Sequence, residues 1–317
     1  MSVVVYVESQ NGVIKKAGLE VASYGRAIAN ATNTSLIAVT FNTNDSSVLN
    51  SHGVDKVYNI NTAEDSFFNV DRYSASLVPI IEKEEASIVV VSATADGRYL
   101  GPILAVGAQA AYFSNVVALP SSYAPLTVKR SCFTNKAFNE SVSNQSKAVI
   151  CLSSNAFGLK EQTSNAENLE GEYLVSNSTL KVTAVDKVTD KVTIADADIV
   201  VSGGRGVKGP ENWHLIEDLA AVLGAATACS KPVSDMGWRP HSEHVGQTGK
   251  PVASNLYIAI GVSGAIQHLA GINSSKIKVV INNDPEAPFF KAADYGIVGD
   301  AFEVVPKLIQ KLRAIKQ

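Results

Sequence analysis

Several features that would mark particular classes of protein are scarce in this sequence of 317 residues. It has only three cysteines, far apart and without a CxxC pair, so neither a disulfide framework nor a zinc or iron–sulfur site is expected. The 27 basic residues are outnumbered by 30 acidic ones, which gives no basic excess for binding nucleic acid. No apolar run approaches the roughly 20 residues of a membrane-spanning helix. We therefore expect neither a nucleic-acid partner nor membrane insertion.

The sequence also has little room for a targeting segment at its start. A β-branched run, Val3–Val7, begins almost at the first residue and reads as a buried strand rather than as a signal or transit peptide. Unpaired cysteines favour a reducing compartment. These two features predict a cytoplasmic protein that is either bacterial or already processed.

Hydrophobic residues make up 46% of the chain, which is enough for two cores, and they alternate between strand-like and helical patterns. In the first half, strands and helices alternate in the order 3–7, 18–30, 35–40, 74–84, 87–92 and 97–110. This alternation predicts a mostly parallel sheet with right-handed crossovers. From 126 to 152 polar and apolar residues alternate, which is typical of antiparallel strands with one solvated face.

Residues 158–197 are polar and rich in valine and threonine, and they predict a last edge strand followed by a linker. From residue 199 the alternation of strands and helices resumes, with a helix over 211–223 that ends at Gly224, and it continues to a helix over 302–315. The predicted fold is α/β, with two tandem α/β domains. Residues 1–190 would form an N-terminal domain with a mostly parallel sheet and an antiparallel portion, and 191–317 a doubly wound C-terminal domain.

Two glycine-rich turns in the C-terminal part are candidates for binding phosphate groups. Gly204–Gly209 satisfies the GxGxxG pattern between a strand and a helix, as dinucleotide binding requires. In NAD-linked domains an acidic residue ends the next strand and binds the ribose, but here that strand ends in Thr227–Lys231. This departure counts against a dehydrogenase, and close packing alone could also explain the glycines.

The second turn, Gly261–His268, is of the same type, and the polar loop Val245–Lys250 lies between the two turns in sequence. Ser263 adds a hydroxyl donor, and His268 falls in the first turn of a predicted helix, although a lone histidine is also common on surfaces and in cores. His241 and His244 are close in sequence, but Pro240 and nearby glycines favour a loop, so we expect them to be solvated or structural. No nucleophile has a convincing partner residue.

These segments resemble the FAD-binding domain of the electron-transfer flavoprotein α subunit. The resemblance runs in order and spacing from about 196 to 317, and its motifs are Val201–Gly206, Val245–Lys250, Gly261–Gly271, Ile281–Pro288 and Ala293–Val298. The first half is compatible with the α subunit's first domain through looser motifs. The resemblance implies a heterodimer in which this chain holds FAD and the β subunit carries AMP, with the N-terminal domain contacting that partner.

The resemblance also implies a set of cofactor-binding residues. Carried over by position, Thr248 would lie near flavin N5, His268 near flavin O2, and Asn282 with Asp300 on the adenosine side. Lys231 stands where the family often has arginine, and it keeps the charge without the planar guanidinium. The full expected set is Arg205, Ser230, Lys231, Val245, Gly246, Gln247, Thr248, Ser263, Gly264, Ala265, Ile266, Gln267, His268, Asn282 and Asp300.

The function that the resemblance implies is that of an electron carrier and not of a substrate-converting enzyme. The carrier would take electrons from dehydrogenases, such as the acyl-CoA dehydrogenases of fatty acid β-oxidation, and pass them to a membrane-bound quinone reductase. Two alternatives remain open. One is a bifurcating flavoprotein that works with NADH and ferredoxin and has a second FAD in the partner subunit. The other is a flavin-dependent oxidoreductase with a small substrate, which would need a catalytic base beside the flavin.

Overall fold

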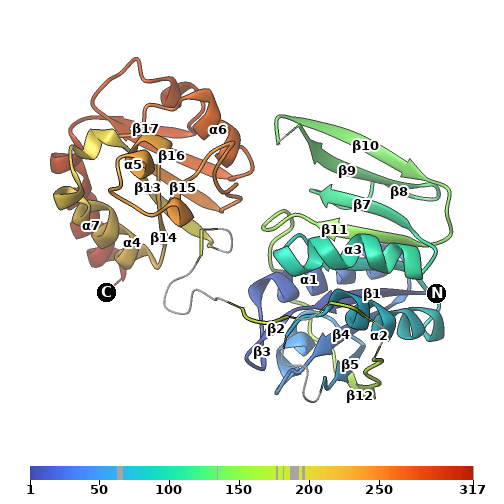
Figure 1. Cartoon of the computed structure of the whole chain (residues 1–317). Coiled ribbons are helices and arrows are strands. Elements are labelled where there is room, and N and C mark those ends of the chain that lie inside the picture. The colour runs from blue at the N-terminus through green and yellow to red at the C-terminus, as the bar shows by residue number, and fades with distance from the viewer. Residues whose placement is uncertain are drawn as a thin grey trace. The chain divides into compact units, whose positions relative to one another are not determined.

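The computed structural model (Figure 1) describes residues 1–62, 67–133, 135–175, 178–180, 182–185, 193–194 and 197–316. The chain divides into two compact units. The first comprises Met1–Cys132 and Phe138–Asp186, and the second Phe133–Ala137 and Lys187–Gln317. The predicted boundary between residues 190 and 191 lies outside the described residues.

A ten-stranded sheet forms the first unit, in the order β10-β9-β7-β11-β6-β1-β4-β5-β12, with β8 paired to β9. The strands from β7 to β12 in this order run parallel to their neighbours, whereas β9 is antiparallel to β7 and β8. The strand bounds are β1 Ser2–Val7, β4 Ser35–Phe41, β5 Lys56–Ile60, β6 Ala86–Ser92, β7 Ala111–Val116, β8 Ser122–Tyr123, β9 Leu126–Cys132, β10 Ala137–Ser143, β11 Ala148–Leu152 and β12 Glu167–Gly171. The predicted mostly parallel sheet with an antiparallel portion is confirmed.

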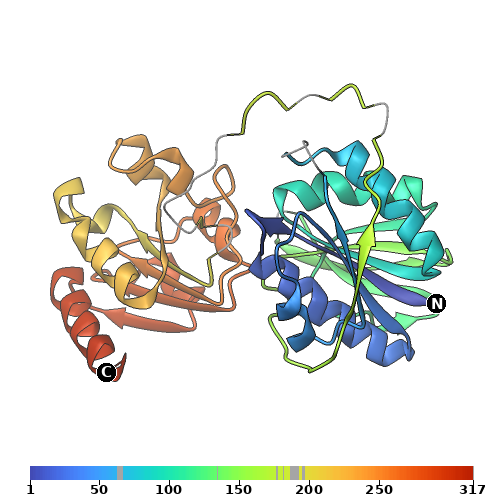
Figure 2. The same ribbon diagram turned by 90° about the horizontal axis from the view of Figure 1, so that it is seen from below.

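Helices cover both faces of this sheet, as the view in Figure 2 shows. Helix α1 (Lys16–Thr32) packs on one face, where Gly25 lets it approach so closely that a Cβ would lie 2.6 Å from Val5 Cγ1. Helices α2 (Val70–Lys83) and α3 (Ala95–Gly107) pack on the other face. Asn69 caps α2 and Thr94 caps α3 with their side-chain oxygens, which satisfies amides that the first helical turn leaves free. Two buried cores result, one on each side of the sheet.

One prediction for the first unit is wrong. The stretch 126–152 was expected to be wholly antiparallel, but its last strand, β11, is parallel to both β6 and β7 and lies between them. All five residues of β11 are buried, so it has no solvated face. The apolar run Ala148–Leu152 therefore belongs to the central sheet, and the alternating pattern applies only to β9 and β10.

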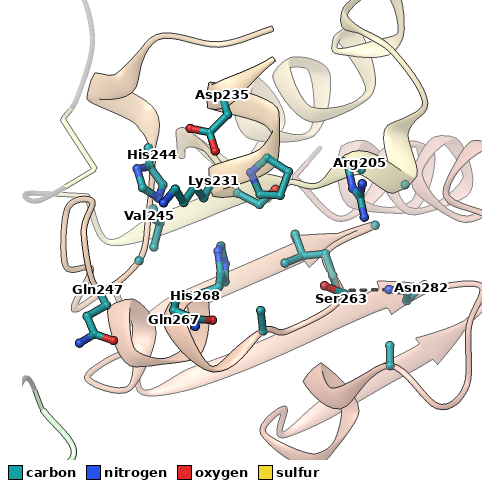
Figure 3. A pocket seen from close by; sticks show the side chains of 18 of the residues that line it. Arg205, Lys231, Asp235, His244, Val245, Gln247, Ser263, Gln267, His268 and Asn282 are labelled. Atoms are coloured by element: carbon teal, nitrogen blue, oxygen red, sulfur yellow. Dashed lines mark hydrogen bonds between the residues drawn. The ribbon is translucent and has the colours of Figure 1, made fainter. Parts of the chain in front are cut away.

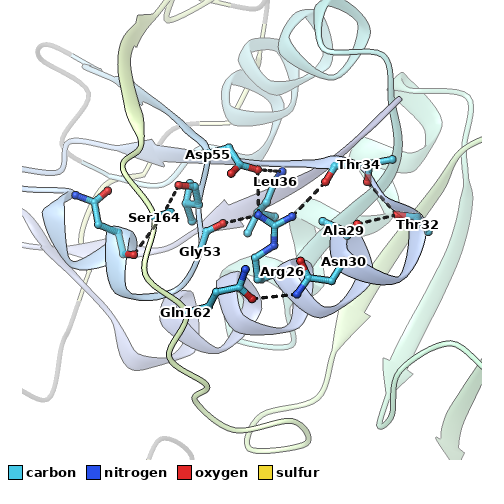
Figure 4. A network of polar contacts seen from close by, with 12 residues as sticks. Arg26, Ala29, Asn30, Thr32, Thr34, Leu36, Gly53, Asp55, Gln162 and Ser164 are labelled. Atoms are coloured by element: carbon cyan, nitrogen blue, oxygen red, sulfur yellow. Dashed lines mark hydrogen bonds and ion pairs between the residues drawn. The ribbon is translucent and has the colours of Figure 1, made fainter.

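A polar network fastens the segment that leads into the edge strand β12 (Figure 4). Arg26 of α1 donates to the carbonyl of Gly53 at 2.8 Å and pairs with Asp55 at 3.1 Å. Asp55 also accepts from the amide of Leu36, at the start of β4, at 2.8 Å. The segment before β12 joins this network, since Gln162 accepts from the side-chain amide of Asn30 at 3.0 Å, and the amide of Glu167 in β12 donates to the carbonyl of Asp55 at 2.9 Å. Since β12 itself is largely exposed, these bonds help to hold it at the sheet edge.

The second unit is a five-stranded parallel sheet in the order β14-β13-β15-β16-β17. This is the 2-1-3-4-5 order of doubly wound folds, so the predicted C-terminal architecture is confirmed. The strand bounds are β13 Ile199–Gly203, β14 Ala226–Cys229, β15 Leu256–Ile260, β16 Ile277–Asn282 and β17 Tyr295–Val298. The helix bounds are α4 His214–Leu223, α5 Lys231–Asp235, α6 Ile266–Ile272 and α7 Ala301–Lys316.

Each face of this sheet has its own core. Helices α4 and α7 pack on one face through Leu219 and Val305, while Tyr257 and Phe289 belong to the core on the other face. Helix α4 begins later than predicted, because 210–212 form a separate 3₁₀ turn, and it ends as expected at Gly224 in the left-handed conformation. Within the described residues, no helix has the length and apolar character needed to cross a membrane.

Candidate cofactor site

The carboxyl ends of β13, β14, β15 and β16 surround a cavity of about 560 Å³ within the second unit (Figure 3). In open α/β sheets this edge is where ligands bind, and the volume is in the usual range for small-molecule sites. The cavity is lined by Arg205, Gly206, Ser230, Lys231, Pro232, Asp235, His244, Val245, Gly246, Gln247, Thr248, Gly261, Val262, Ser263, Ala265, Gln267, His268, Asn282, Asp284 and Ala287.

The two glycine-rich turns pack against each other at this edge. The amide of Gly204 donates to the carbonyl of Ile260 at 2.9 Å, and the amide of Gly206 donates to Gly261 at 3.0 Å. A Cβ on Gly204 would lie 2.2 Å from the carbonyl oxygen of Gly261, and Gly261 itself has a φ of +62°. Gly204 and Gly206, the first two glycines of the GxGxxG pattern, are thus required by contact between two backbones, in addition to any role beside a ligand.

The loop Val245–Lys250 is held in place by backbone hydrogen bonds to β14 and to α6. The amide of Val245 donates to the carbonyl of Cys229 at the end of β14, at 3.0 Å. The amide of Gln247 donates to the carbonyl of Gln267 in α6, at 2.7 Å. Gly246 lies so close to α6 that a Cβ on Gly271 would be 2.6 Å from its Cα. The side chains of Gln247 and Thr248 are exposed. The loop backbone is therefore fixed while its polar groups remain available.

The second turn presents polar groups to the opposite part of the cavity. Asn282 is buried at the end of β16, and its side-chain amide donates to the carbonyl of Val262 at 3.1 Å, which braces the turn. Ser263 is exposed, and its carbonyl accepts from Phe289. Across the described residues, the amides of Ser263 and Ala265 donate to no backbone carbonyl. A ligand in the cavity could accept hydrogen bonds from these groups.

Charged side chains of both signs reach the cavity. Arg205 and Lys231 are exposed and lie on the side of β13 and β14, and Figure 3 shows Arg205 near Ser263 and Lys231 near His244. Asp235 and Asp284 are also exposed at its margin. The two cations are separate and could attract an extended anionic ligand at more than one point.

His268 is buried in the cavity wall. Its Nε2 lies 2.9 Å from the hydroxyl of Tyr257, and the ring is also 6.1 Å from that of Phe289. Burial lowers the pKa of His268 to about 4, with a further contribution from the positive form of His244, while an electrostatic interaction with the backbone of Val245 opposes the shift. The imidazole is therefore neutral at pH 7.

His244 was expected to be solvated or structural, but it is buried and lines the cavity beside Lys231. Burial lowers its pKa from the ordinary value. His241 is exposed and pairs with Ser234 at 2.9 Å. The two histidines thus have different surroundings, and nowhere in the described ranges do three His, Cys, Asp or Glu residues form a group that could hold a metal ion.

Of the residues predicted for the cofactor, the structure brings together around the cavity Arg205, Ser230, Lys231, Val245, Gly246, Gln247, Thr248, Ser263, Ala265, Gln267, His268 and Asn282. Three others do not line it. Gly264 packs against Phe289, and Ile266 is 74% exposed. Asp300 caps α7 through the amide of Phe302 and pairs with Lys208 at 3.7 Å.

The expected set of cofactor-binding residues leaves out Gly206, Gly261 and Val262, although they lie in the two predicted glycine-rich turns. It also misses Pro232, Asp235, His244, Asp284 and Ala287, which line the cavity as well. Most of them adjoin a predicted residue at the carboxyl end of a strand. Taking two residues on either side of each predicted contact would have included Pro232, His244 and Asp284. Asp235 lies one helical turn beyond Lys231 in α5, and only the fold places it here.

Comparison with known families agrees with the division of the chain. Residues 3–172 match the model described as the electron transfer flavoprotein domain, and residues 193–273 match the electron transfer flavoprotein FAD-binding domain. FAD is therefore the cofactor of the second unit.

Curated relatives are similar over nearly their whole length. The electron transfer flavoprotein subunit alpha of Bacillus subtilis (strain 168) is 36% identical over 322 residues, covering 99% of this chain and 98% of the relative. The subunit of the same name from Thermoanaerobacterium thermosaccharolyticum is 31% identical and covers 98% of each chain. The protein named FixB from Clostridium saccharobutylicum is 31% identical over 98% of this chain and 96% of its own.

Proposed function

The chain belongs to the electron transfer flavoprotein α-subunit family, and from this we propose that it is the FAD-holding subunit of a heterodimer that carries electrons between other proteins. Its electron donors would be dehydrogenases, such as those that oxidise acyl-CoA in fatty acid β-oxidation. Its acceptor would be a membrane-bound quinone reductase. The heterodimer would work in the bacterial cytoplasm, with AMP in the β subunit.

The cavity suits FAD in its size and in the groups that surround it. FAD combines an anionic pyrophosphate with an uncharged ring system and needs both cationic and neutral hydrogen-bonding partners. Arg205 and Lys231 supply positive charge, while Ser263, Gln267 and the backbone amides of the second turn supply neutral donors. The glycine turns, which would clash if either carried a Cβ, leave room for close approach of a ligand. These features support FAD at this site.

We assign the two ends of the cavity to different parts of the cofactor. Ser263, Gly264, Ala265, Ile266 and Gln267 would hold the pyrophosphate and ribityl region, with Asn282 and Asp300 toward the adenosine. Ser230, Lys231 and the loop Val245–Thr248 would contact the flavin, with the Thr248 hydroxyl near N5 and His268 near O2. This order agrees with Figure 3, where Ser263 and Asn282 lie toward one end and His244 and Gln247 toward the other.

Bound FAD supplies the redox chemistry, because it accepts and donates electrons singly or in pairs. The residues of this chain bind it, orient it and adjust its electrostatic surroundings. Lys231 favours added negative charge on a nearby ring, and solvent screens this effect because the side chain is exposed. His268 is neutral and can hold a single proton at a defined ring nitrogen.

The two histidines of the cavity wall offer little for converting a small substrate. Of its two histidines, His268 makes a hydrogen bond to Tyr257 and is only 6% exposed, and His244 is equally buried. A general base must reach the proton that it removes, and these side chains have little surface with which to do so. This observation favours a carrier over a substrate-converting enzyme.

Stepwise reduction of the purified heterodimer tests the proposal. With oxygen excluded, the bound FAD should take up electrons in two resolved one-electron steps and return them to a one-electron acceptor. The observation that carries the proposal is the cavity at the family's FAD-binding domain, lined by most of the predicted contacts. Reduction in a single two-electron step would contradict the one-electron role, and turnover of NADH with a small substrate would favour the enzyme.

A further inference from the structure

A buried hydroxyl lies directly behind the histidine in the cavity wall. Tyr257 is in the central strand β15 and is completely buried, with its ring stacked at 6.5 Å on that of Phe289. Its hydroxyl is 2.9 Å from Nε2 of His268, across from β15 to α6. Tyr257 does not line the cavity, and His268 is the lining residue to which its hydroxyl bonds.

The phenol of Tyr257 and the neutral imidazole of His268 carry one exchangeable proton each. Burial raises the pKa of Tyr257 well above its ordinary value, although Ser202 opposes the shift, so the phenol keeps its proton at pH 7. The imidazole is neutral and has one N–H, which is on either Nδ1 or Nε2. If the phenol donates to Nε2, the imidazole proton is on Nδ1. If Nε2 is protonated, the phenol must accept.

The surroundings of the other ring nitrogen decide between these arrangements. The backbone of Val245 interacts with the imidazole in a way that favours a ring N–H. The amide of Val245 already donates to Cys229, so the backbone group of Val245 that remains to interact with a ring N–H is its carbonyl, which is an acceptor. Nδ1 is buried and forms no hydrogen bond of normal geometry with any described residue. An N–H at Nδ1 would face the carbonyl favourably, whereas a bare Nδ1 would face it lone pair to lone pair.

We propose that Tyr257 is a positioning residue for His268, because its phenol donates to Nε2 and thereby fixes the single proton of the imidazole on Nδ1. The imidazole ring is then held in one orientation between the sheet and the loop Val245–Lys250. The tautomer itself does not depend on the proposed function. Only its consequence does, namely that His268 lies beside bound FAD in a single tautomer. The removal of the phenol would allow the proton to move to Nε2 and the ring to turn.

Nitrogen NMR of the histidine rings tests the tautomer directly. In ¹⁵N-labelled, FAD-free heterodimer at pH 7, His268 should show a protonated Nδ1 and an unprotonated Nε2, with the signals assigned by their loss in His268→Gln. Tyr257→Phe should move the proton wholly or partly to Nε2. A protonated Nε2 in the unaltered protein would overturn the proposal, and this measurement does not depend on whether the variant folds.

A matched control separates positioning from stability. Tyr24→Phe also removes a completely buried hydroxyl that makes one 2.9 Å bond, to the carbonyl of Ala118, but in the first unit. Tyr257→Phe should weaken FAD binding by about two- to tenfold, because a misplaced imidazole would lose a contact with FAD worth about one hydrogen bond, and Tyr24→Phe should leave the affinity unchanged. Equal FAD affinity in Tyr257→Phe would contradict a positioning role. If the tautomer is as proposed but FAD is reduced in a single step, the inference stands and the proposed carrier function fails.

Discussion

The two units present the same edge of a parallel sheet and use it differently. In the first unit, Glu8 follows β1 and is 2% exposed, and it accepts a hydrogen bond from Thr94, the cap of α3 after β6. Lys15 pairs with the same carboxylate at 3.5 Å. In the second unit, the corresponding ends of β13 and β15 carry the glycine turns and open into the cavity.

In a parallel sheet, ligands often bind where the strand order reverses, at the carboxyl ends of the two strands concerned. The difference between the units shows that such a place is not by itself a binding site. Where β1 and β6 diverge, a carboxylate of the chain itself occupies the place near the α3 cap that an anion would need. Where β13 and β15 diverge, glycines keep side chains out of that place. The first unit is closed by its own side chain, Glu8, and the second is left open for FAD.

The largest effect is expected at the contact between the two glycine turns. Gly204 has a φ of −111°, which any residue can adopt, but a Cβ there would lie 2.2 Å from a backbone oxygen. Gly204→Ala should therefore destabilise the second unit by more than about 3 kcal/mol and abolish FAD retention. Chemical denaturation and flavin content after purification would measure both effects.

Gly224→Ala is the matched control for this change. Gly224 has a φ of +67°, and a Cβ there would meet nothing within 4 Å, so only backbone strain applies. We expect a cost of about 1 kcal/mol with FAD retained. Equal effects of the two substitutions would show that close packing of the turns is not the reason for the glycine at 204.

His268 should make the stability of the second unit depend on pH. Its pKa is lowered to about 4 in the folded state, so between that value and the unfolded value near 6.5 the unfolded chain binds more protons. Stability is then full above about pH 6.5 and falls as the pH drops toward 4, by about 3 kcal/mol. Denaturation of FAD-free heterodimer at pH 7 and pH 4.5 should show a smaller loss in His268→Gln than in the unaltered protein.

Glu8 should contribute to the first unit through its hydrogen bonds more than through its charge. Burial raises the pKa of Glu8, so its ionised form is disfavoured despite Lys15. Glu8→Gln should remain within about 1 kcal/mol of the original stability at pH 7, whereas Glu8→Ala should lose about 2 kcal/mol by leaving Thr94 without its partner. Because the folded pKa is raised, the stability of the unaltered protein relative to Glu8→Gln should decline as the pH rises through that pKa. The absence of such a decline would indicate that the carboxylate is stabilised by its charge.

The smallest effect is expected at Lys231, which is exposed and acts on FAD through water-accessible space. Lys231→Ala should weaken FAD binding about fivefold at low salt and less at high salt, while Lys231→Arg should stay within about twofold. Lys276→Ala, which removes an exposed lysine outside the cavity lining, is the control. Titration with FAD at two ionic strengths would measure these affinities, and a salt-independent loss would point to packing instead of charge.

The sequence was most informative where one physical requirement determined the pattern. Continuous apolar runs such as Val3–Val7 predicted buried strands, and Gly224 marked the end of α4. The placement of β11 could not be predicted, because a five-residue apolar run suits either strand direction and only its neighbours decide.

The site shows the same limit. The segments that form the cavity were predicted from their glycines and polar loops. Ligand binding explained only part of the need for glycine, because Gly204 and Gly261 also contact each other although they are 57 residues apart in sequence. His244 was missed because its burial depends on the fold of the loop between β14 and β15. Tyr257 reads as an ordinary strand residue until its hydroxyl is seen beside His268.

Hydrogen–deuterium exchange of the heterodimer with and without FAD tests the central claim most directly, because it compares both sheet edges in one experiment. The account predicts that FAD slows exchange in the segments 203–209, 245–250 and 261–268 and leaves the ends of β1 and β6, around Glu8 and Thr94, unchanged. Slower exchange at Glu8 and Thr94, with no change in the glycine turns of the second unit, would contradict it.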